Sequence, residues 1–249
     1  MAISTSLTKR LGIEHPVILA PMGFVSGGAL AAAVSAGGGF GTIGGGYADP
    51  DWLEREFALA GNCPVGCGFI TWALAKRPAT LDLALSHHPP AIMLSFGDAT
   101  PFLPKVKRAE ALAICQVQSL AQARAVLLEG ADIIVAQGTE AGGHGGGRST
   151  LPLVPAVVDM IARSGRDTRA VHNRFSGTWH GGGEEALAQD EAERTRYAEA
   201  AARGDPDIAV VFASEGIDLI HAIEPASVIL AQVLQEAEAA LARSFSIAV

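Results

Sequence analysis

Short apolar runs alternate with segments of helical periodicity along the first two thirds of the chain. These runs are rich in Val, Ile and Phe, mostly lack apolar–polar alternation, and end at glycine or a small polar cluster. Continuous apolar runs are typical of parallel strands that are covered on both faces. We therefore predict strands at residues 16–20, 39–44, 64–70, 91–96, 113–117 and 133–136.

The segments between these runs carry the signals of helix starts. Residues with short polar side chains, which favour the N-cap position, precede apolar residues at Asp49, Thr80, Ser119 and Thr150. After Thr150, apolar residues from Val154 to Ile161 recur with the spacing of one helix face. Strands that alternate with helices predict βαβ units and a parallel sheet, so the fold class is α/β with six βα units before residue 163.

The chain after Ser164 changes character, and a closed barrel of eight strands would need two more βα units there. Only residues 208–213 resemble another strand, and residues 184–203 resemble a solvated helix. Apolar residues spaced from Leu230 to Leu241 predict a final amphipathic helix. We therefore predict an incomplete TIM-type (β/α) barrel over residues 1–163, with a helical C-terminal segment, residues 164–249, packed on it.

The composition narrows the class of protein. Hydrophobic residues make up 49% of the 249 residues, enough for a sizeable core, yet no apolar stretch has the length of a membrane helix. A net charge of −8 argues against nucleic acid as a partner. Three cysteines and no secretory signal favour a reducing, cytoplasmic location. Cys63 and Cys67 lack a second cysteine pair, so we expect no metal site.

The candidate chemistry lies in residues 137–147, directly after the predicted strand 133–136. This stretch reads Gln-Gly-Thr-Glu-Ala-Gly-Gly-His-Gly-Gly-Gly and holds six glycines around His144. Glycines allow backbone N–H groups to approach a ligand closely, and an imidazole exchanges protons near neutral pH. A strand followed by a glycine turn and a reactive side chain is typical of a catalytic βα loop.

Five segments, in order and spacing, resemble the nitronate monooxygenase family, also called 2-nitropropane dioxygenase. Their sequences are PVILAPMG, GFGTIG, VGCGF, ICQV and QGTEAGGH, at residues 16–23, 39–44, 65–69, 114–117 and 137–144. The resemblance covers residues 1–163 and resumes near Thr168. In the family, strands seven and eight carry the glycine turns that bind the flavin phosphate, and their motifs are missing here around residues 164–167.

The resemblance implies an enzyme that holds FMN at the C-terminal mouth of the barrel and oxidises alkyl nitronates or nitroalkanes with O₂. The resemblance is also compatible with assembly of the chain into a homo-oligomer. His144 would be the catalytic base. The residues that would contact the flavin or its ribityl chain are Pro21, Met22, Gly23, Gly68, Gln116, Gln137, Gly142 and Gly143.

Several alternatives remain open from the sequence. A second hypothesis is a non-catalytic, truncated family member that cannot hold FMN tightly. A third hypothesis is a flavin-dependent enoyl thioester reductase with a nicotinamide donor. Glu140 is either functional or a loop-shaping residue, and Gly44 to Gly46 form either a phosphate loop or a tight strand-to-helix turn.

Overall fold

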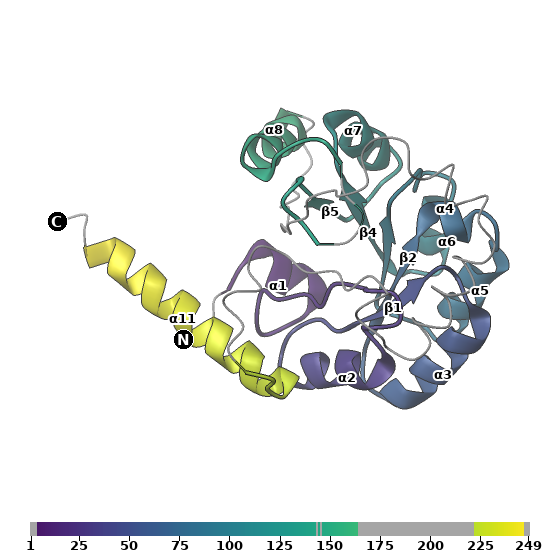
Figure 1. Cartoon of the computed structure of the whole chain (residues 1–249). Helices are drawn as coiled ribbons and strands as arrows, with labels where there is room; N and C mark the ends of the chain where they lie inside the picture. The colour runs from purple at the N-terminus through teal and green to yellow at the C-terminus, as the bar shows by residue number, and fades with distance from the viewer. Residues whose placement is uncertain (1–3, 143, 145, 164–221, 247–249) are drawn as a thin grey trace, which may run out of the picture.

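The structure is a computed structural model of the chain, and it describes residues 4–142, 144, 146–163 and 222–246. Its five parallel strands are hydrogen-bonded in chain order, and Figure 1 shows them as an arc with helices around its outer side. The strands are β1 (Thr42–Gly46), β2 (Gly66–Ile70), β3 (Ala91–Ser95), β4 (Leu112–Val117) and β5 (Ile133–Ala136). The arc confirms the predicted incomplete α/β barrel.

The first predicted strand, at residues 16–20, is the main difference from the sequence prediction. The structure reduces it to a single parallel bridge between Ile18 and Phe40. The Leu19 N–H donates to the Phe40 carbonyl and the Phe40 N–H donates to the Val17 carbonyl, both at 2.9 Å. Proline, which has no N–H to donate to a ladder, stands at both ends of this segment, and this limits its pairing.

The helices lie between and around the strands, and those predicted to start at Asp49, Ser119 and Thr150 begin at or directly after these residues. Asp49 caps α3 by accepting hydrogen bonds from the N–H groups of Asp51 and Trp52, and Ser119 caps α7. The predicted cap at Thr80 is wrong, because its hydroxyl donates to the Ala48 carbonyl from inside α5. The helices are α1 (Ser6–Leu11), α2 (Gly28–Ala36), α3 (Pro50–Ala60), α4 (Thr71–Leu74), α5 (Ala79–Ser86), α6 (Leu103–Arg108), α7 (Leu120–Leu128), α8 (Thr150–Arg163) and α11 (Ala226–Ser246).

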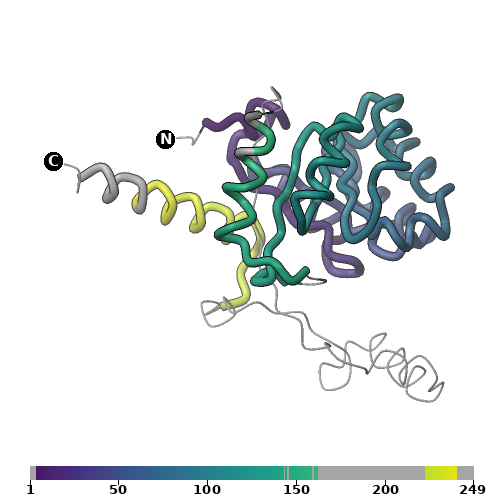
Figure 2. The backbone as a smooth tube through the Cα atoms, turned by 90° about the horizontal axis from the view of Figure 1, so that it is seen from above, coloured from purple at the N-terminus to yellow at the C-terminus, as the bar shows by residue number. Residues whose placement is uncertain are grey.

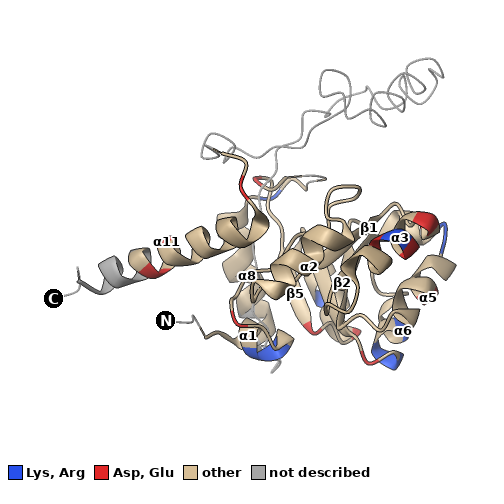
Figure 3. Ribbon diagram, turned by 90° about the horizontal axis from the view of Figure 1, so that it is seen from below, with Lys and Arg blue, Asp and Glu red and all other residues tan. Residues whose placement is uncertain are grey.

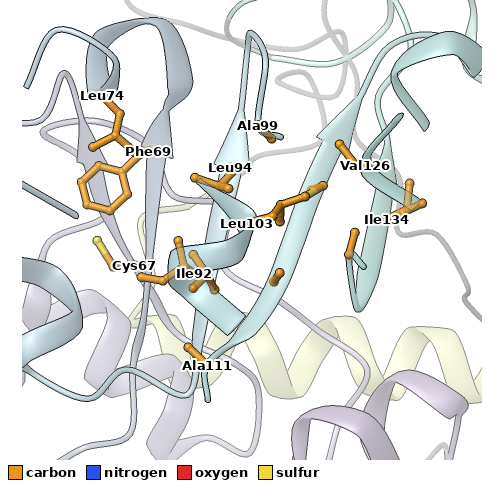
Figure 4. Close-up of a cluster of buried hydrophobic side chains, with 14 of the residues drawn as sticks. Cys67, Phe69, Leu74, Ile92, Leu94, Ala99, Leu103, Ala111, Val126 and Ile134 are labelled. Carbon is orange, nitrogen blue, oxygen red and sulfur yellow. The ribbon is translucent and has the colours of Figure 1, made fainter. Parts of the chain in front are cut away.

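The core has two layers, one on each face of the sheet. Ile92 and Leu94 of β3 point into the outer layer, between the strands and the helices, part of which Figure 4 shows. Ala91 and Met93 point inward, into a smaller layer that α1 closes with Leu7. Because successive side chains of a strand alternate between faces, the polar residues that continue the inward series should line the interior of the arc.

An anchor joins the amino ends of the strands to two helices. Asp132, directly before β5, accepts from the Ala113 N–H at 2.9 Å, from Lys107 of α6 at 2.7 Å and from Arg10 of α1 at 2.5 Å. Figure 3 shows, in blue on the ribbon, the basic residues of α1 and α6. Burial by itself would raise the pKa of Asp132, but these three partners outweigh it and lower the pKa below its usual range.

The C-terminal helix confirms the predicted amphipathic segment. Its first turns lie beside α2, where Leu230 is buried against Gly37, and the rest extends away from the barrel (Figures 1 and 2). Among the described residues, no helix combines the length and apolar character needed to cross a membrane. The predicted segments 184–203 and 208–213 lie outside the described residues, as does the join between the two predicted regions.

Candidate functional site

Two glutamines meet where β4 and β5 end. Gln116 continues the inward series of β4, and Gln137 directly follows β5. The Nε2 of Gln116 donates to the Oε1 of Gln137 at 2.8 Å, and the same oxygen accepts from the Nε2 of Gln118 at 2.5 Å. The sequence predicted Gln116 and Gln137 as neighbours of one ligand, and the structure brings them into direct contact.

Gln118 is a site residue that the sequence reasoning missed. It lies two positions after Gln116, so the same alternation that directs Gln116 inward could have identified it. Ser95 at the end of β3 also joins the group, because its hydroxyl lies 3.5 Å from the Oε1 of Gln116. The carbonyl of Ser95 accepts a hydrogen bond from the Thr71 hydroxyl at 3.0 Å, which ties β3 to the start of α4. Polar side chains from three successive strand ends therefore form one network.

His144 lies against this network. Its ring contacts that of Phe96 edge-on, with 5.2 Å between the ring centres, and its carbonyl lies 3.5 Å from the Nε2 of Gln118. Phe96 directly follows β3 and has a φ of 59°, a left-handed conformation that is uncommon outside glycine. The candidate base is therefore at the carboxyl end of the sheet, beside strand ends β3 and β4, as a barrel active site requires.

The loop that carries His144 is shaped by Glu140. The Oε2 of Glu140 accepts from the backbone N–H of Thr150 at 2.8 Å and from its hydroxyl at 2.6 Å, at the first residue of α8. A side chain at Gly138 would be 2.0 Å from the same hydroxyl, so the loop closes tightly there. Glu140 thus has the loop-shaping role. Gly142 is half-buried in the same loop, and Gly143 lies outside the described residues.

On the other side of the mouth, the turn after the first bridge is held by Ser26. This fully buried hydroxyl donates to the Ala20 carbonyl at 2.6 Å and accepts from the Met22 N–H at 2.7 Å. The Ser26 carbonyl accepts from the Gly44 N–H at 2.8 Å, which fixes the turn to β1. Ser26 was not among the predicted residues, because its partners are the backbone groups of a turn whose shape the sequence does not reveal.

Glycines in β1 and β2 let this turn approach the sheet. An added Cβ would lie 2.1 Å from the Met22 carbonyl at Gly44, and 2.3 Å from the Pro21 ring at Gly68. The absent side chain of Gly68 therefore makes room for Pro21, and a direct contact of Gly68 with a cofactor ring stays a prediction. The three glycines that end β1 fit the geometric interpretation rather than that of a phosphate loop. Met22 itself is 43% exposed, so it is not part of the core.

The cysteines take no part in this site. Cys67 and Cys115 point into the outer core and are fully buried. Burial raises the pKa of both thiols, that of Cys115 to about 12, so neither is a thiolate near neutral pH. Within the part of the chain that the structure describes, no group of three or more His, Cys, Asp or Glu side chains is arranged to hold a metal ion.

The sequence that carries these strand ends matches a known family. The family model described as nitronate monooxygenase matches residues 4–63 and 73–163. The chain belongs to the nitronate monooxygenase family. A nitronate monooxygenase of Pseudomonas aeruginosa is 34% identical over an alignment of 182 positions, which covers 56% of this chain and 51% of that protein. The family resemblance is thereby confirmed, and four of the five segments lie within the matched residues.

Another relative of this chain is named for a different reaction. A dehydrogenase of Mycobacterium tuberculosis, named for the substrate (3aS,4S,5R,7aS)-5-hydroxy-7a-methyl-1-oxo-octahydro-1H-indene-4-carboxyl-CoA, is 29% identical over 180 residues, 71% of this chain and 50% of that protein. This chain spans about half the length of these curated relatives.

Two solved structures agree with the fold. FabK from Thermotoga maritima superposes with a TM-score of 0.79 at 22% identity, over 98% of this chain and 99% of that one. Nitroalkane oxidase from Streptomyces ansochromogenes superposes with a TM-score of 0.52 at 28% identity, over 68% of this chain and 60% of that one. The first similarity supports the barrel fold alone.

The residues of the mouth suit the flat ring of the flavin that this family implies. The amide groups of Gln116, Gln118 and Gln137 offer donors and acceptors for the polar edge of such a ring, and convergent polar groups of this kind fix the orientation of a bound ligand. The half-exposed Met22 and the turn backbone offer an apolar surface. The strand ends that hold the flavin phosphate in the family have no counterpart among the described residues.

Proposed function

We propose that this chain carries the flavin site of an enzyme that oxidises alkyl nitronates or nitroalkanes with O₂. The observation that supports this most is the grouping of His144 with Gln116, Gln118 and Gln137 at one end of the sheet. FMN is the cofactor that we expect, and small nitro compounds are the substrates. When bound, the flavin would accept electrons from the substrate and O₂ would reoxidise it.

His144 is the proposed general base. The carbon next to a nitro group is acidic because the electron pair left by the proton moves onto the nitro oxygens, which gives a nitronate. A neutral imidazole can take that proton, and a positioned base of this kind contributes about 10²- to 10⁴-fold to the rate. The Phe96 ring, edge-on at 5.2 Å, restricts the orientation of the imidazole. His144 therefore matters for a neutral nitroalkane and much less for a substrate that is already a nitronate.

The glutamine amides are proposed to position the substrate and the flavin and to stabilise the negative charge that develops on them. Their N–H groups can donate to negative oxygen atoms of a nitronate or to a flavin ring that has gained charge. Because Gln116 and Gln118 share one acceptor on Gln137, the three side chains hold each other in place before a ligand arrives. Pro21, Met22 and Gly23 would support the ring, with Gly142 and Gly143 at its ribityl side.

The test compares two forms of one substrate. In flavin-loaded protein, His144→Ala should lower kcat/KM for neutral nitroethane by about 10²-fold or more and change that for ethyl nitronate less than about tenfold. Oxygen uptake measures both reactions. His88→Ala, at an exposed histidine, is the matched control and should change neither. Equal turnover of nitroethane by the wild type and His144→Ala would refute the assignment of the base.

A second candidate function is redox chemistry on a coenzyme A thioester. The similarity to the dehydrogenase of Mycobacterium tuberculosis over 71% of this chain favours it, since that relative is named for a carboxyl-CoA substrate. This candidate would be selected if NAD(P)H is oxidised only when an enoyl thioester is present and if adding a nitronate causes no oxygen uptake. A purified chain that holds no flavin and turns over neither substrate would favour the non-catalytic hypothesis.

A further inference from the structure

Four aromatic side chains gather at the ends of β1 and β2. Three of them are half-exposed: Phe24 at 60%, Tyr47 at 44% and Trp72 at 43%. Trp52 of α3 is the fourth, and we call Phe24, Tyr47, Trp52 and Trp72 the aromatic cluster. Aromatic residues make up only 6% of the chain, and these four come from four different segments. Their convergence at the carboxyl end of the sheet, where barrels bind ligands, needs an explanation.

The cluster is preformed by ring contacts. The Phe24 ring lies 6.2 Å from that of Tyr47 and 5.2 Å from that of Trp52, and the Tyr47 ring lies 5.7 Å from that of Trp72. The Trp52 indole donates to the Gly44 carbonyl at 2.9 Å, which ties the cluster to β1. Phe24 has a φ of 62°, and such strained residues concentrate at ligand sites. The exposed ring faces are therefore held in place without a ligand.

A hollow of about 360 Å³ opens between these rings and α4. Its apolar lining residues are Phe24, Tyr47, Trp72 and Ala73, and its polar lining residues are Asp49, Lys76 and Arg77. The volume is at the lower end of the range of small-molecule sites, so it suits a fragment such as one nucleotide. The turn of Pro21 to Gly23, which directly precedes Phe24, connects this hollow with the mouth of the barrel.

The polar lining is locally cationic in a protein of net charge −8. The Lys76 ammonium lies 5.2 Å from the centre of the Trp72 ring, a cation–π distance. Arg77 follows it, and among the described residues no carboxylate is within 4 Å of either cation. The carboxylate of Asp49 already accepts hydrogen bonds from two N–H groups of α3. An arginine and a lysine beside an aromatic face are suited to bind phosphate.

We propose that this hollow binds the phosphate-bearing adenosine of a larger ligand whose reactive part reaches the mouth. An adenine can stack on the exposed ring of Trp72 or Tyr47, and its phosphate can pair with Lys76 and Arg77. Two ligands share this chemistry, namely a coenzyme A thioester and a nicotinamide dinucleotide. The binding needs neither His144 nor a bound flavin, so its failure and the failure of nitronate oxidation are separate results.

A nucleotide fits these observations better than a protein or membrane partner does. Rings that insert into a bilayer or a partner's groove project as separate anchors, whereas Phe24, Tyr47 and Trp72 are linked by ring contacts and line a shallow hollow. A nucleotide base can stack on the face of an aromatic ring, and the strength of this contact depends little on which base it is. The lining combines aromatic rings with two cations, as a ligand with a flat base and an anionic group requires.

Isothermal titration calorimetry on the whole chain, without substrate turnover, tests the proposal. The probes are adenosine 3′,5′-bisphosphate and coenzyme A, NADP⁺ and adenosine 2′,5′-bisphosphate, with adenosine and inorganic phosphate as partial ligands. We expect saturable binding of at least one phosphate-bearing nucleotide, weaker binding at higher salt, and binding of each partial ligand that is about tenfold weaker or more.

Variants locate the site. Lys76→Ala/Arg77→Ala should weaken nucleotide binding by roughly tenfold or more, because charge-assisted hydrogen bonds are lost. Trp72→Ala should weaken it by about tenfold, and Trp72→Phe should restore most of the affinity because a stacking face remains. The matched control, Lys9→Ala/Arg124→Ala, removes two exposed positive charges elsewhere and should leave the affinity unchanged.

The set of probes that binds identifies the ligand of the hollow. Binding of the coenzyme A probes alone assigns the hollow to a thioester, binding of the NADP⁺ probes alone assigns it to a dinucleotide, and binding of both assigns general nucleotide recognition. The proposal is overturned if no nucleotide binds, or if inorganic phosphate or adenosine binds as well as the bisphosphates. It is also overturned if the control weakens binding as much as the Lys76/Arg77 variant, or if anionic vesicles but no nucleotides are bound.

Discussion

The β1–β2 side of the mouth is positioned by backbone packed on glycine, whereas the β4–β5 side is positioned by hydrogen bonds between side chains. On the first side, Pro21 fills the space that a side chain at Gly68 would occupy. On the second side, Gln116 and Gln118 share one acceptor, Gln137. The first arrangement tolerates almost no added volume, while the second depends on matching donors and acceptors.

This difference assigns different consequences to substitutions on the two sides. A change on the glycine side should act through packing, so it should lower the stability of the fold more than it lowers the affinity for a ligand. A change on the glutamine side removes polar partners but leaves the backbone in place, so it should affect ligand binding at a modest cost in stability. Of the three stability predictions below, given from the largest expected effect to the smallest, the first and the last test this difference, and the second tests the anchor at the opposite end of the sheet.

Gly68→Ala should have the largest effect. The added methyl would lie 2.3 Å from the Pro21 ring, with β2 behind it, so neither side can move away freely. We expect the free energy of unfolding to fall by about 1–3 kcal/mol or more. Gly147→Ala, at a glycine with no atom within 4 Å of an added Cβ, is the control. Denaturant unfolding measures both, and equal stability of the two variants would show that the turn is not packed as described.

Asp132→Asn tests the charged anchor at the amino end of β5. A carboxyl whose pKa is lowered in the folded state adds stability that is present above its ordinary pKa, about 3.9, and is lost as the pH falls through the folded value. We expect a loss of about 1–3 kcal/mol at pH 7, since Arg10 and Lys107 are partly exposed.

The acid range sharpens this prediction. Wild-type stability should fall as the pH drops below about 4, and the variant should lack that part of the decrease. Asp82→Asn breaks a comparable pair with Lys105 at an exposed site and should cost at most about 1 kcal/mol. A variant with the same acid dependence as the wild type would show that Asp132 does not set it.

Gln116→Ala and Gln137→Ala form a double-mutant cycle on the other side of the mouth. Each single change leaves a partner amide without its hydrogen bond, so the two effects should be coupled by about 0.5–1.5 kcal/mol. Chemical unfolding of the four proteins gives this coupling energy. Strict additivity would mean that the 2.8 Å contact contributes nothing to the folded state.

The sequence predicts the local elements well and the long-range contacts poorly. Continuous apolar runs identify β2 to β5 because a strand covered on both faces needs little else. The segment at residues 16–20 looks the same, yet its pairing depends on how the chain turns at Pro21, which local pattern does not encode. Asp132 could not be predicted as an anchor, since its partners Arg10 and Lys107 are distant in the sequence.

The candidate site divides in the same way. The family resemblance implies that Gln116 and Gln137 face one ligand, and the His144 loop is identified by its glycines. Ser26 and Phe24 are not predicted, because a buried hydroxyl on a turn and a left-handed phenylalanine depend on the tertiary fold. The aromatic cluster likewise assembles from four segments that carry no shared sequence signal.

A flavin titration tests the central claim most directly, namely that the strand ends form a mouth for an isoalloxazine ring. FMN added to the whole chain should lose fluorescence in a saturable, one-to-one titration. The affinity should fall by about tenfold in Gln116→Ala/Gln137→Ala and stay unchanged in Gln235→Ala, an exposed glutamine of α11. Absence of saturable binding, or equal affinity in all three proteins, would contradict the account.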